Sequence, residues 1–356
     1  MRRTLLNSER LGWMALCLVV LSATSVRAAT PTPPAPAAAA PDEPAQWLDR
    51  MNKALTSTNY DGTYSLWLGG KVELLRIIHR VKDGVISERL VSLDGSGREF
   101  IRTGGDLTCY LPDKRTVLVE RRPAEESLFG NFPAINAQTV SSYDIREVAR
   151  TRLNRRAMRV ILVAPKDEYR YGYRLWIDES TAMPWKTQLC DAHGRVIEQT
   201  VFANLTPAAH IPDSAFKPDM STEGFRWLRT ETPGPPKEPV TSTLLFWSAL
   251  KLPPGFKMTV HSAQVLPGSN DPVDHLVFTD GMASVSVFVE AHSADGAPSV
   301  NEDESATVGT SSAFSTVVDG HKVTAVGEVP PATVRFFADS VKRQGVTMSL
   351  SGPPRH

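Results

Sequence analysis

The chain has 356 residues, of which 41% are hydrophobic and 22% are charged, and its 39 basic residues balance 39 acidic ones. This composition indicates a folded globular protein, and the length indicates two or three domains. The balanced charge provides no basic excess, so the composition gives no reason to expect nucleic acid as a partner.

The first 28 residues have the parts of a secretory signal peptide. An apolar run over residues 11–21 follows a basic start, and Val26-Arg27-Ala28 fits the pattern of a cleavage site. The run is well short of the about 20 apolar residues of a membrane span. A lipoprotein signal needs a small residue where Leu16 precedes Cys17. We therefore predict a cleaved signal over residues 1–28 and a secreted protein that is not a lipoprotein.

Residues 29–44 are rich in proline and alanine, and we predict a flexible leader because they can bury almost nothing. A helix is predicted to follow, with Asp42 as its cap and Pro44 in its first turn. Its apolar residues recur at helical spacing and form one stripe for the sheet that follows. The stripe consists of Trp47, Leu48, Met51, Ala54 and Leu55.

Residues 60–120 alternate between strand and turn signals with no helical pattern between them. Turn sequences recur roughly every 8–12 residues, which is the spacing of an antiparallel meander. They are Gly69-Gly70, Asp83-Gly84, Asp94-Gly95-Ser96-Gly97, Gly104-Gly105-Asp106 and Pro112-Asp113. A strongly curved sheet with apolar residues on its inner face makes either a packed core or a hydrophobic pocket.

Further strands are predicted after a break in this pattern. The segment 121–143 is irregular but apolar, so it either packs as short helices into the concave face of the sheet, which we favour, or gates a ligand site as a lid. In the later strand 169–178, alternation directs Tyr171 and Tyr173 inward and Arg170 to the other face. The strands after the break are 144–149, 157–164, 169–178, 184–190 and 196–204.

A proline-rich segment separates two predicted domains. Periodicity is lost over residues 212–239, and 233–239 can form only extended polyproline-like backbone. We predict a first domain over 45–215, a linker over 216–240 and a small α+β second domain over 241–350. The second domain is predicted to contain strands at 257–264, 274–279, 284–291, 307–318 and 321–328 and a helix from Pro331.

Cys109 and Cys190 are the cysteines beyond the predicted signal peptide. An oxidising compartment would permit a disulfide between them. We predict that both are unpaired, because strands so far apart in a meander seldom bring two Cα atoms within about 7 Å.

No pattern in the sequence predicts catalysis, a cofactor or a metal site. Gly95-Ser96-Gly97 lacks the spacing of a nucleophile elbow, and the eight histidines lack metal-ligand spacing. The acidic run 301–304 lacks the alternating ligands of a calcium loop. We therefore predict that the chain is not an enzyme.

A basic set in the first domain has two interpretations. Its arginines could bind anionic headgroups through bidentate hydrogen bonds, or they could lie on a solvated face of the sheet, which is the simpler interpretation. The candidates for headgroup binding are Arg150, Arg152 and Arg155.

Several segments resemble one known family in their order and spacing. In the first domain they are NYDGT at 59–63, LRIIHR at 75–80, ERL at 88–90, LDG at 93–95, RE at 98–99 and YGYRLWID at 171–178. In the second domain they are LPPGF at 252–256, FTDG at 278–281, SVSVFV at 284–289 and VGEVPP at 326–331. Together they resemble the RseB/MucB family of periplasmic sigma-E regulators over nearly the whole mature chain.

The resemblance implies an α+β protein whose first domain is a LolA/LolB-like curved antiparallel sheet, a half-barrel wrapped over helices. It implies a periplasmic protein that binds the periplasmic region of a membrane anti-sigma factor (RseA/MucA-like) and protects it from site-1 proteolysis. Such a protein is a negative regulator of the sigma-E envelope stress response. Acyl chains of lipoproteins or lipopolysaccharide are the implied releasing ligands. The sequence leaves open whether the protein forms a homo-oligomer.

The alternative function is that of a periplasmic lipoprotein carrier or lipid-binding protein, which explains the first domain alone. Either function requires a hydrophobic site, which we predict on the inner face of the first-domain strands. Spacing on one face selects the lipid-binding candidates Leu66, Leu68, Leu75, Ile77, Leu90, Tyr171 and Tyr173.

Overall fold

The computed structural model describes residues 43–121, 127–129, 141–230, 247–265, 272–291 and 303–343. The predicted signal peptide, the leader up to residue 42 and the proline-rich stretch 233–239 lie outside these residues. Most of the described chain forms two sheets with few helices. The predicted curved antiparallel sheet of the first domain is therefore confirmed, whereas the wrapping over helices and the α+β class of the second domain stay predictions.

Helix α1 (Pro44–Ser57) begins where the sequence predicts it. Pro44 lies in the first turn, where its missing N–H removes no helical hydrogen bond. Glu43 is the N-cap and makes no side-chain capping bond, whereas the predicted cap Asp42 lies outside the described residues. The whole predicted apolar stripe of this helix is buried.

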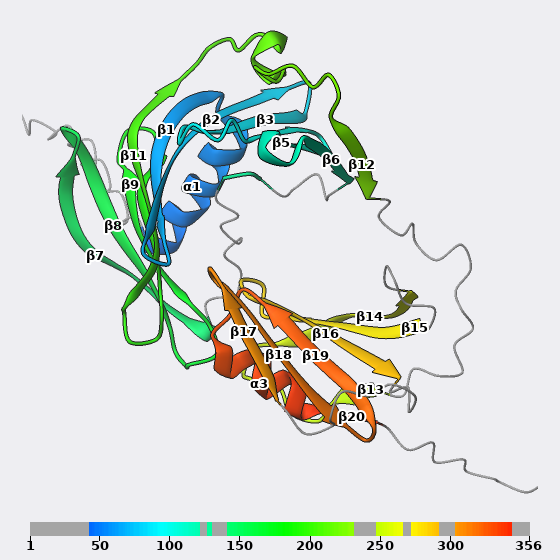
Figure 1. Cartoon of the computed structure of the whole chain (residues 1–356). Coiled ribbons are helices and arrows are strands. Elements are labelled where there is room, and N and C mark those ends of the chain that lie inside the picture. Colours follow the sequence, from blue (N-terminus) through cyan, green and yellow to red (C-terminus); the bar gives the residue numbers. More distant parts are fainter. Residues whose placement is uncertain are drawn as a thin grey trace, which may run out of the picture. The chain divides into compact units, whose positions relative to one another are not determined.

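The first sheet has twelve strands in the order β12-β6-β5-β4-β3-β2-β1-β11-β10-β9-β8-β7 (Figure 1). Two meanders therefore run outward from the neighbouring strands β1 and β11. The strands are β1 (Tyr60–Leu68), β2 (Lys71–Lys82), β3 (Val85–Ser92), β4 (Glu99–Thr103), β5 (Asp106–Leu111), β6 (Thr116–Arg121), β7 (Tyr143–Leu153), β8 (Arg156–Pro165), β9 (Gly172–Asp178), β10 (Pro184–Cys190), β11 (Val196–Pro207) and β12 (Arg226–Thr230).

The turns of the first meander fall where the sequence predicts them. Gly69 and Gly70 join β1 to β2, and Asp83 and Gly84 join β2 to β3. All four residues have a positive φ, which glycine adopts readily and aspartate tolerates. The short 3-10 helix η1 (Pro112–Lys114) joins β5 to β6. Local turn chemistry thus fixes the lengths of these strands.

Strand β12 lies inside the range predicted as a linker, so that prediction is wrong over these residues. It pairs in parallel with β6, from Arg226 opposite Thr116 to Thr230 opposite Glu120. The 3-10 helix η2 (Asp213–Phe216) precedes it, and Phe216 and Phe225 pack on a small cluster of the first sheet. The sequence shows no apolar alternation here because β12 is an edge strand without a buried face. The loss of periodicity therefore did not indicate the end of the first sheet.

The main core lies between α1 and the inner face of the first sheet (Figure 1). Phe129 also packs there, with its ring centroid 5.1 Å from that of Tyr64 and 5.0 Å from that of Phe202. Phe129 therefore packs on the sheet, as the interpretation that we favoured requires, but residues 127–129 do not form the predicted short helix. The remainder of that segment, apart from its ends, lies outside the described residues.

The second sheet has six strands in the order β14-β15-β16-β19-β18-β17. The segment predicted as one strand over 307–318 is two strands, because Gly309 has a φ of 64° and reverses the chain. Helix α3 (Pro331–Ser340) buries Val334 and Phe337 in the core of this sheet. The strands are β14 (Lys257–Val265), β15 (Pro272–Thr279), β16 (Ser284–Ala291), β17 (Glu304–Val308), β18 (Ser311–Val318) and β19 (His321–Gly327), with a separate pair β13 (Trp247–Ala249) and β20 (Val341–Arg343).

Cys109 and Cys190 are buried and form no disulfide with each other, as predicted. Cys109 lies in β5 and Cys190 in β10, and five other strands separate them in the sheet. At about 4.8 Å per strand, they are roughly 29 Å apart along the sheet. Burial raises the pKa of the Cys190 thiol, which keeps it protonated and unreactive.

Candidate binding site

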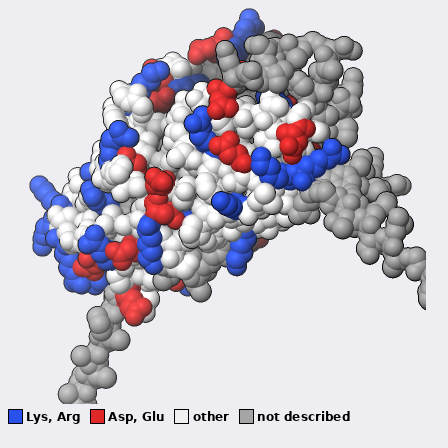
Figure 2. Space-filling model, turned by 90° about the horizontal axis from the view of Figure 1, so that it is seen from below, with Lys and Arg blue, Asp and Glu red and all other residues white. Residues whose placement is uncertain are grey.

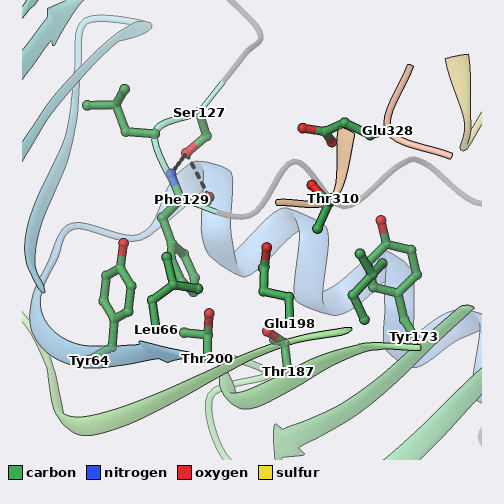
Figure 3. A pocket seen from close by; sticks show the side chains of 12 residues that line it. Tyr64, Leu66, Ser127, Phe129, Tyr173, Thr187, Glu198, Thr200, Thr310 and Glu328 are labelled. Atoms are coloured by element: carbon green, nitrogen blue, oxygen red, sulfur yellow. Dashed lines mark hydrogen bonds between the residues drawn. The ribbon is translucent and has the colours of Figure 1, made fainter. Parts of the chain in front are cut away.

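The candidate site is a cavity of about 280 Å³ over the inner face of the first sheet. Strand pairing places Leu66 of β1 opposite Thr200 of β11, and Thr200 opposite Thr187 of β10. These three side chains form one row of its floor. They rise from the same side of the sheet in Figure 3, because cross-strand partners share a face.

A second row continues the floor and meets residues of the second sheet. Glu198 of β11 is opposite Leu189 of β10, which is opposite Tyr173 of β9. Thr310, in the turn between β17 and β18, and Glu328, directly after β19, also line the cavity. In Figure 3 they lie across the cavity from Glu198. Residues distant in the sequence thus converge on one small space.

Residues 127–129 form one wall of the cavity, and buried Glu88 holds this wall in place. The Ser127 hydroxyl donates to Oε1 of Glu88 at 2.5 Å, and the Leu128 N–H donates to Oε2 at 2.8 Å. Arg102 also donates to Oε2, at 3.1 Å. Residues 127–129 are therefore held in place by hydrogen bonds to the Glu88 carboxylate and by the packing of Phe129 in the core.

The cavity is acidic. Burial raises the pKa of Glu198, and the neighbouring charge of Glu328 raises it further. Burial also raises the pKa of Tyr64 and of Tyr173, so both phenols are neutral over the physiological range. Among the described residues that line the cavity there is no lysine, arginine or histidine.

Two predicted lipid-binding residues, Leu66 and Tyr173, line this cavity. Leu75 and Ile77 are instead buried in the main core, and Leu90 packs against that core from β3. Alternation identified the inner face correctly for these residues. It could not distinguish a side chain beside the cavity from one that packs in the core.

The other two predicted residues lie outside the cavity lining. A Cβ built on Gly309 would lie 3.2 Å from Cδ2 of Leu68, so Leu68 contacts the turn between β17 and β18. Tyr171 is buried just before the first residue of β9. A role of the seven predicted residues in lipid binding remains a prediction.

The headgroup candidates Arg150, Arg152 and Arg155 belong to the hairpin of β7 and β8, and the cavity lining does not include them. All three are exposed, and Nε of Arg150 donates to Oε1 of Glu147 at 2.6 Å. On the face shown in Figure 2, basic and acidic side chains are interspersed. Binding of anionic headgroups by these arginines remains a prediction.

Sequence alternation missed the role of Arg170, which is completely buried rather than on an outer face. Strand β9 begins only at Gly172, so strand alternation does not apply at position 170. The guanidinium donates to Asp280 at 2.5 Å, to the carbonyl oxygen of Pro254 at 2.6 Å and to Asp167 at 3.0 Å. The chain before β9 is thereby bound to the turn before β14 and to the turn between β15 and β16.

The described ranges contain neither a metal site nor a membrane-spanning helix. No group of three His, Cys, Asp or Glu side chains there could hold a metal ion. No helix in the same ranges has the length and apolar character to cross a bilayer.

Comparison with known proteins identifies relatives of the whole described chain. Residues 43–220 match the model of the MucB/RseB N-terminal domain, and residues 241–342 match that of the MucB/RseB C-terminal domain. The sigma factor AlgU regulatory protein MucB of Pseudomonas aeruginosa is 32% identical over 297 residues, which cover 83% of this chain and 90% of the relative. The sigma-E factor regulatory protein RseB of Escherichia coli K12 is 27% identical over 334 residues, which cover 93% and 97%.

A solved structure agrees with these relatives. The complex of Pseudomonas aeruginosa MucA and MucB contains a chain that matches with a TM-score of 0.63 and 27% identity, over 85% of this chain and 99% of that one. Both family models match in order along the sequence, and the similarity extends over both sheets. The chain belongs to the MucB/RseB family.

Proposed function

We propose that this protein binds the periplasmic region of a membrane anti-sigma factor and acts as a negative regulator of the envelope stress response. The observation that carries the proposal is the similarity to a chain of the MucA/MucB complex over 99% of that chain's length. By binding the anti-sigma factor, the protein protects it from site-1 proteolysis. Binding rather than catalysis is therefore its function.

The proposal includes a location and a division into domains. The predicted signal over 1–28 would deliver the mature chain to the periplasm. The two family matches support a first domain over 45–215, which we propose is a LolA/LolB-like half-barrel, and an α+β domain over 241–350. The position of α1 on the inner face of the first sheet and of α3 on the second sheet supports this division.

We also propose that acyl chains of lipoproteins or lipopolysaccharide regulate the partner through residues 127–129. Phe129 fills the core between Tyr64 and Phe202, and residues 127–129 also wall the cavity. An acyl chain that replaced the Phe129 ring would gain about 0.8 kcal/mol for each buried methylene. It would also move the wall, so lipid and partner would weaken each other by the same factor.

The alternative function is that of a periplasmic lipoprotein carrier. A carrier needs only the first sheet, and it would release lipid to an acceptor without any effect on a protein partner. The regulator differs because its lipid affinity depends on whether the anti-sigma segment is bound. Reciprocal inhibition therefore separates the two functions.

The test is protection of the partner from proteolysis. The mature chain and the periplasmic region of the anti-sigma factor from the same organism are mixed with the cognate site-1 protease, with and without a synthetic diacyl lipopeptide. The proposal requires that the chain slow cleavage and that the lipopeptide restore it. Equal cleavage rates with and without the chain would reject the proposed function, and protection that lipopeptide leaves unchanged would reject the lipid part.

A further inference from the structure

Two carboxylates of the cavity have no neutralising partner within the described chain. Glu198 extends from β11, and Glu328 follows β19, and they face the same space (Figure 3). Among the described residues neither makes an ion pair or a side-chain hydrogen bond, and burial and the charge of Glu328 raise the pKa of Glu198. Glu198 is half-buried, whereas Glu328 is exposed. Two neighbouring like charges without a described counter-ion favour a cationic ligand.

Three hydroxyl groups of the lining also lack partners in the described ranges. The side chains of Tyr64, Thr187 and Thr200 are only 4%, 8% and 5% exposed, and no protein group described here hydrogen-bonds to their hydroxyls. Because these residues line the cavity, their hydroxyls are available to a ligand there. The oxygens of these groups, together with the two carboxylates, form a set of acceptors that suits a ligand with many N–H donors.

The remaining lining and the size of the cavity limit the shape of that ligand. Leu66, Leu189 and Phe129 provide apolar surface beside the acceptors. Their arrangement suits a methylene stem that ends in a charged group, which is the structure of lysine and arginine side chains. A volume of about 280 Å³ lies at the small end of ligand pockets, so it suits one side chain better than a lipid.

We propose that this cavity binds an arginine or lysine side chain of the partner polypeptide, with its cationic group between Glu198 and Glu328 and its stem against Leu66 and Leu189. This inference rests on the proposed function, because it specifies the chemistry by which the polypeptide partner is recognised. Guanidinium offers five donors and ammonium three, and neither accepts hydrogen bonds. An anionic headgroup would meet two carboxylates in this cavity and no basic side chain among the described lining residues.

The first experiment tests the cavity without any protein partner. Methyl signals of Leu66 and Leu189 in the mature chain are followed by NMR during titration with Nα-acetyl-arginine amide, and separately with the citrulline analogue, which has nearly the same shape but no charge. We expect saturable shifts with the arginine compound and about tenfold weaker binding of the citrulline compound, since a hydrogen bond between charged groups is stronger than one to a neutral group.

Variants locate the binding group. Glu198→Gln and Glu328→Gln keep the side-chain shape, and each should weaken the arginine compound about tenfold, because each removes one charged acceptor. Glu223→Gln is the matched control, because Glu223 is exposed and outside the cavity lining. Unchanged circular dichroism confirms folding of each variant. Equal affinity of the cavity variants and the control would overturn the inference, as would tighter binding of laurate than of the arginine compound at these methyl groups.

The second experiment separates this inference from the proposed function. The affinity of the anti-sigma periplasmic region is measured for the wild type, for both cavity variants and for Glu223→Gln. Weaker binding by the cavity variants alone supports the inference, as does wild-type affinity that falls when the pH approaches the raised pKa of Glu198. Equal binding by all four proteins overturns it and leaves the proposed function intact. Arginine binding without any binding of the periplasmic region supports an acidic cavity that binds cations and rejects the proposed function.

Discussion

Arg170 and Asp280 form an ion pair in which neither side chain has any solvent exposure. Nη1 of Arg170 donates to Oδ2 of Asp280 at 2.5 Å, and Oδ1 of the same carboxylate accepts the N–H groups of Met282 and Ala283 at 2.8 and 2.6 Å. The Tyr143 hydroxyl lies 3.4 Å from Oδ2. The pair therefore joins the two sheets and also shapes the turn between β15 and β16.

Replacement of Arg170 by methionine should reduce the free energy of unfolding by about 3–5 kcal/mol, because it leaves Asp280 buried without its cation. Urea unfolding followed by tryptophan fluorescence measures the change. Arg146→Met is the control, because Arg146 forms an exposed pair with Asp144 that should contribute less than about 1 kcal/mol. Equal losses for the two variants would contradict the buried role of Arg170.

Ser127 should control access to the core. Ser127→Ala removes the 2.5 Å bond to Glu88, and loss of a bond to a charged group should cost about 1.5–3 kcal/mol within residues 127–129. The wall that contains Phe129 should then open more often. We expect tighter binding of a fluorescent fatty acid to this variant than to the wild type. Ser96→Ala, in an exposed turn of the same sheet, is the control, and equal affinities would argue against entry beside the wall.

Stability should fall below neutral pH through His79. Burial lowers the pKa of His79, whose Nδ1 lies 2.9 Å from the Thr58 carbonyl oxygen and whose Nε2 lies 4.0 Å from Glu88. The unfolded chain takes up a proton near the ordinary value of about 6.5, whereas the folded chain resists it. The free energy of unfolding should therefore decrease as the pH falls below that value, by at most about 1.4 kcal/mol per pH unit.

Unfolding of His79→Phe at two pH values, one on each side of that ordinary value, measures this contribution. The His79 ring stacks on the Tyr60 ring, with 4.8 Å between the ring centroids, and the variant keeps an aromatic ring at this position. The variant should lose less stability in acid than the wild type. His275→Phe provides a comparison, since burial also lowers the pKa of His275. If His79→Phe and the wild type lost the same stability in acid, His79 would take up its proton equally in the folded and unfolded states, which would contradict this prediction.

The sequence predicted those parts of the fold that depend on neighbouring residues. Pro44 and the stripe of α1, and the turn at Gly69 and Gly70, depend on helical spacing and on backbone freedom, both of which are local. Strand β12 was missed because its pairing with β6 connects segments more than 100 residues apart. Gly309 divides a segment whose apolar alternation alone predicted one strand.

The candidate site could be predicted only in part for the same reason. Alternation placed Leu66 and Tyr173 on the inner face, where they line the cavity. The acidic character of the cavity was missed, because Glu198 and Glu328 meet only through tertiary packing. Arg170 was missed because its partner Asp280 is 110 residues away.

The two cysteines should remain thiols in the purified protein. Alkylation in denaturant without a reductant should label both Cys109 and Cys190, because five strands separate β5 from β10. Mass spectrometry of the digest measures this labelling, and a reduced sample is the control. Recovery of a peptide pair that links these two cysteines would contradict the strand order of the first sheet.

The most direct test of the regulatory function is calorimetric titration of the mature chain with the periplasmic region of the anti-sigma factor. We predict saturable binding, with an affinity that falls about 5–150-fold in the presence of a saturating diacyl lipopeptide. The lipopeptide affinity should fall by the same factor when the periplasmic region is bound. Absence of saturable binding to a folded chain would contradict the account.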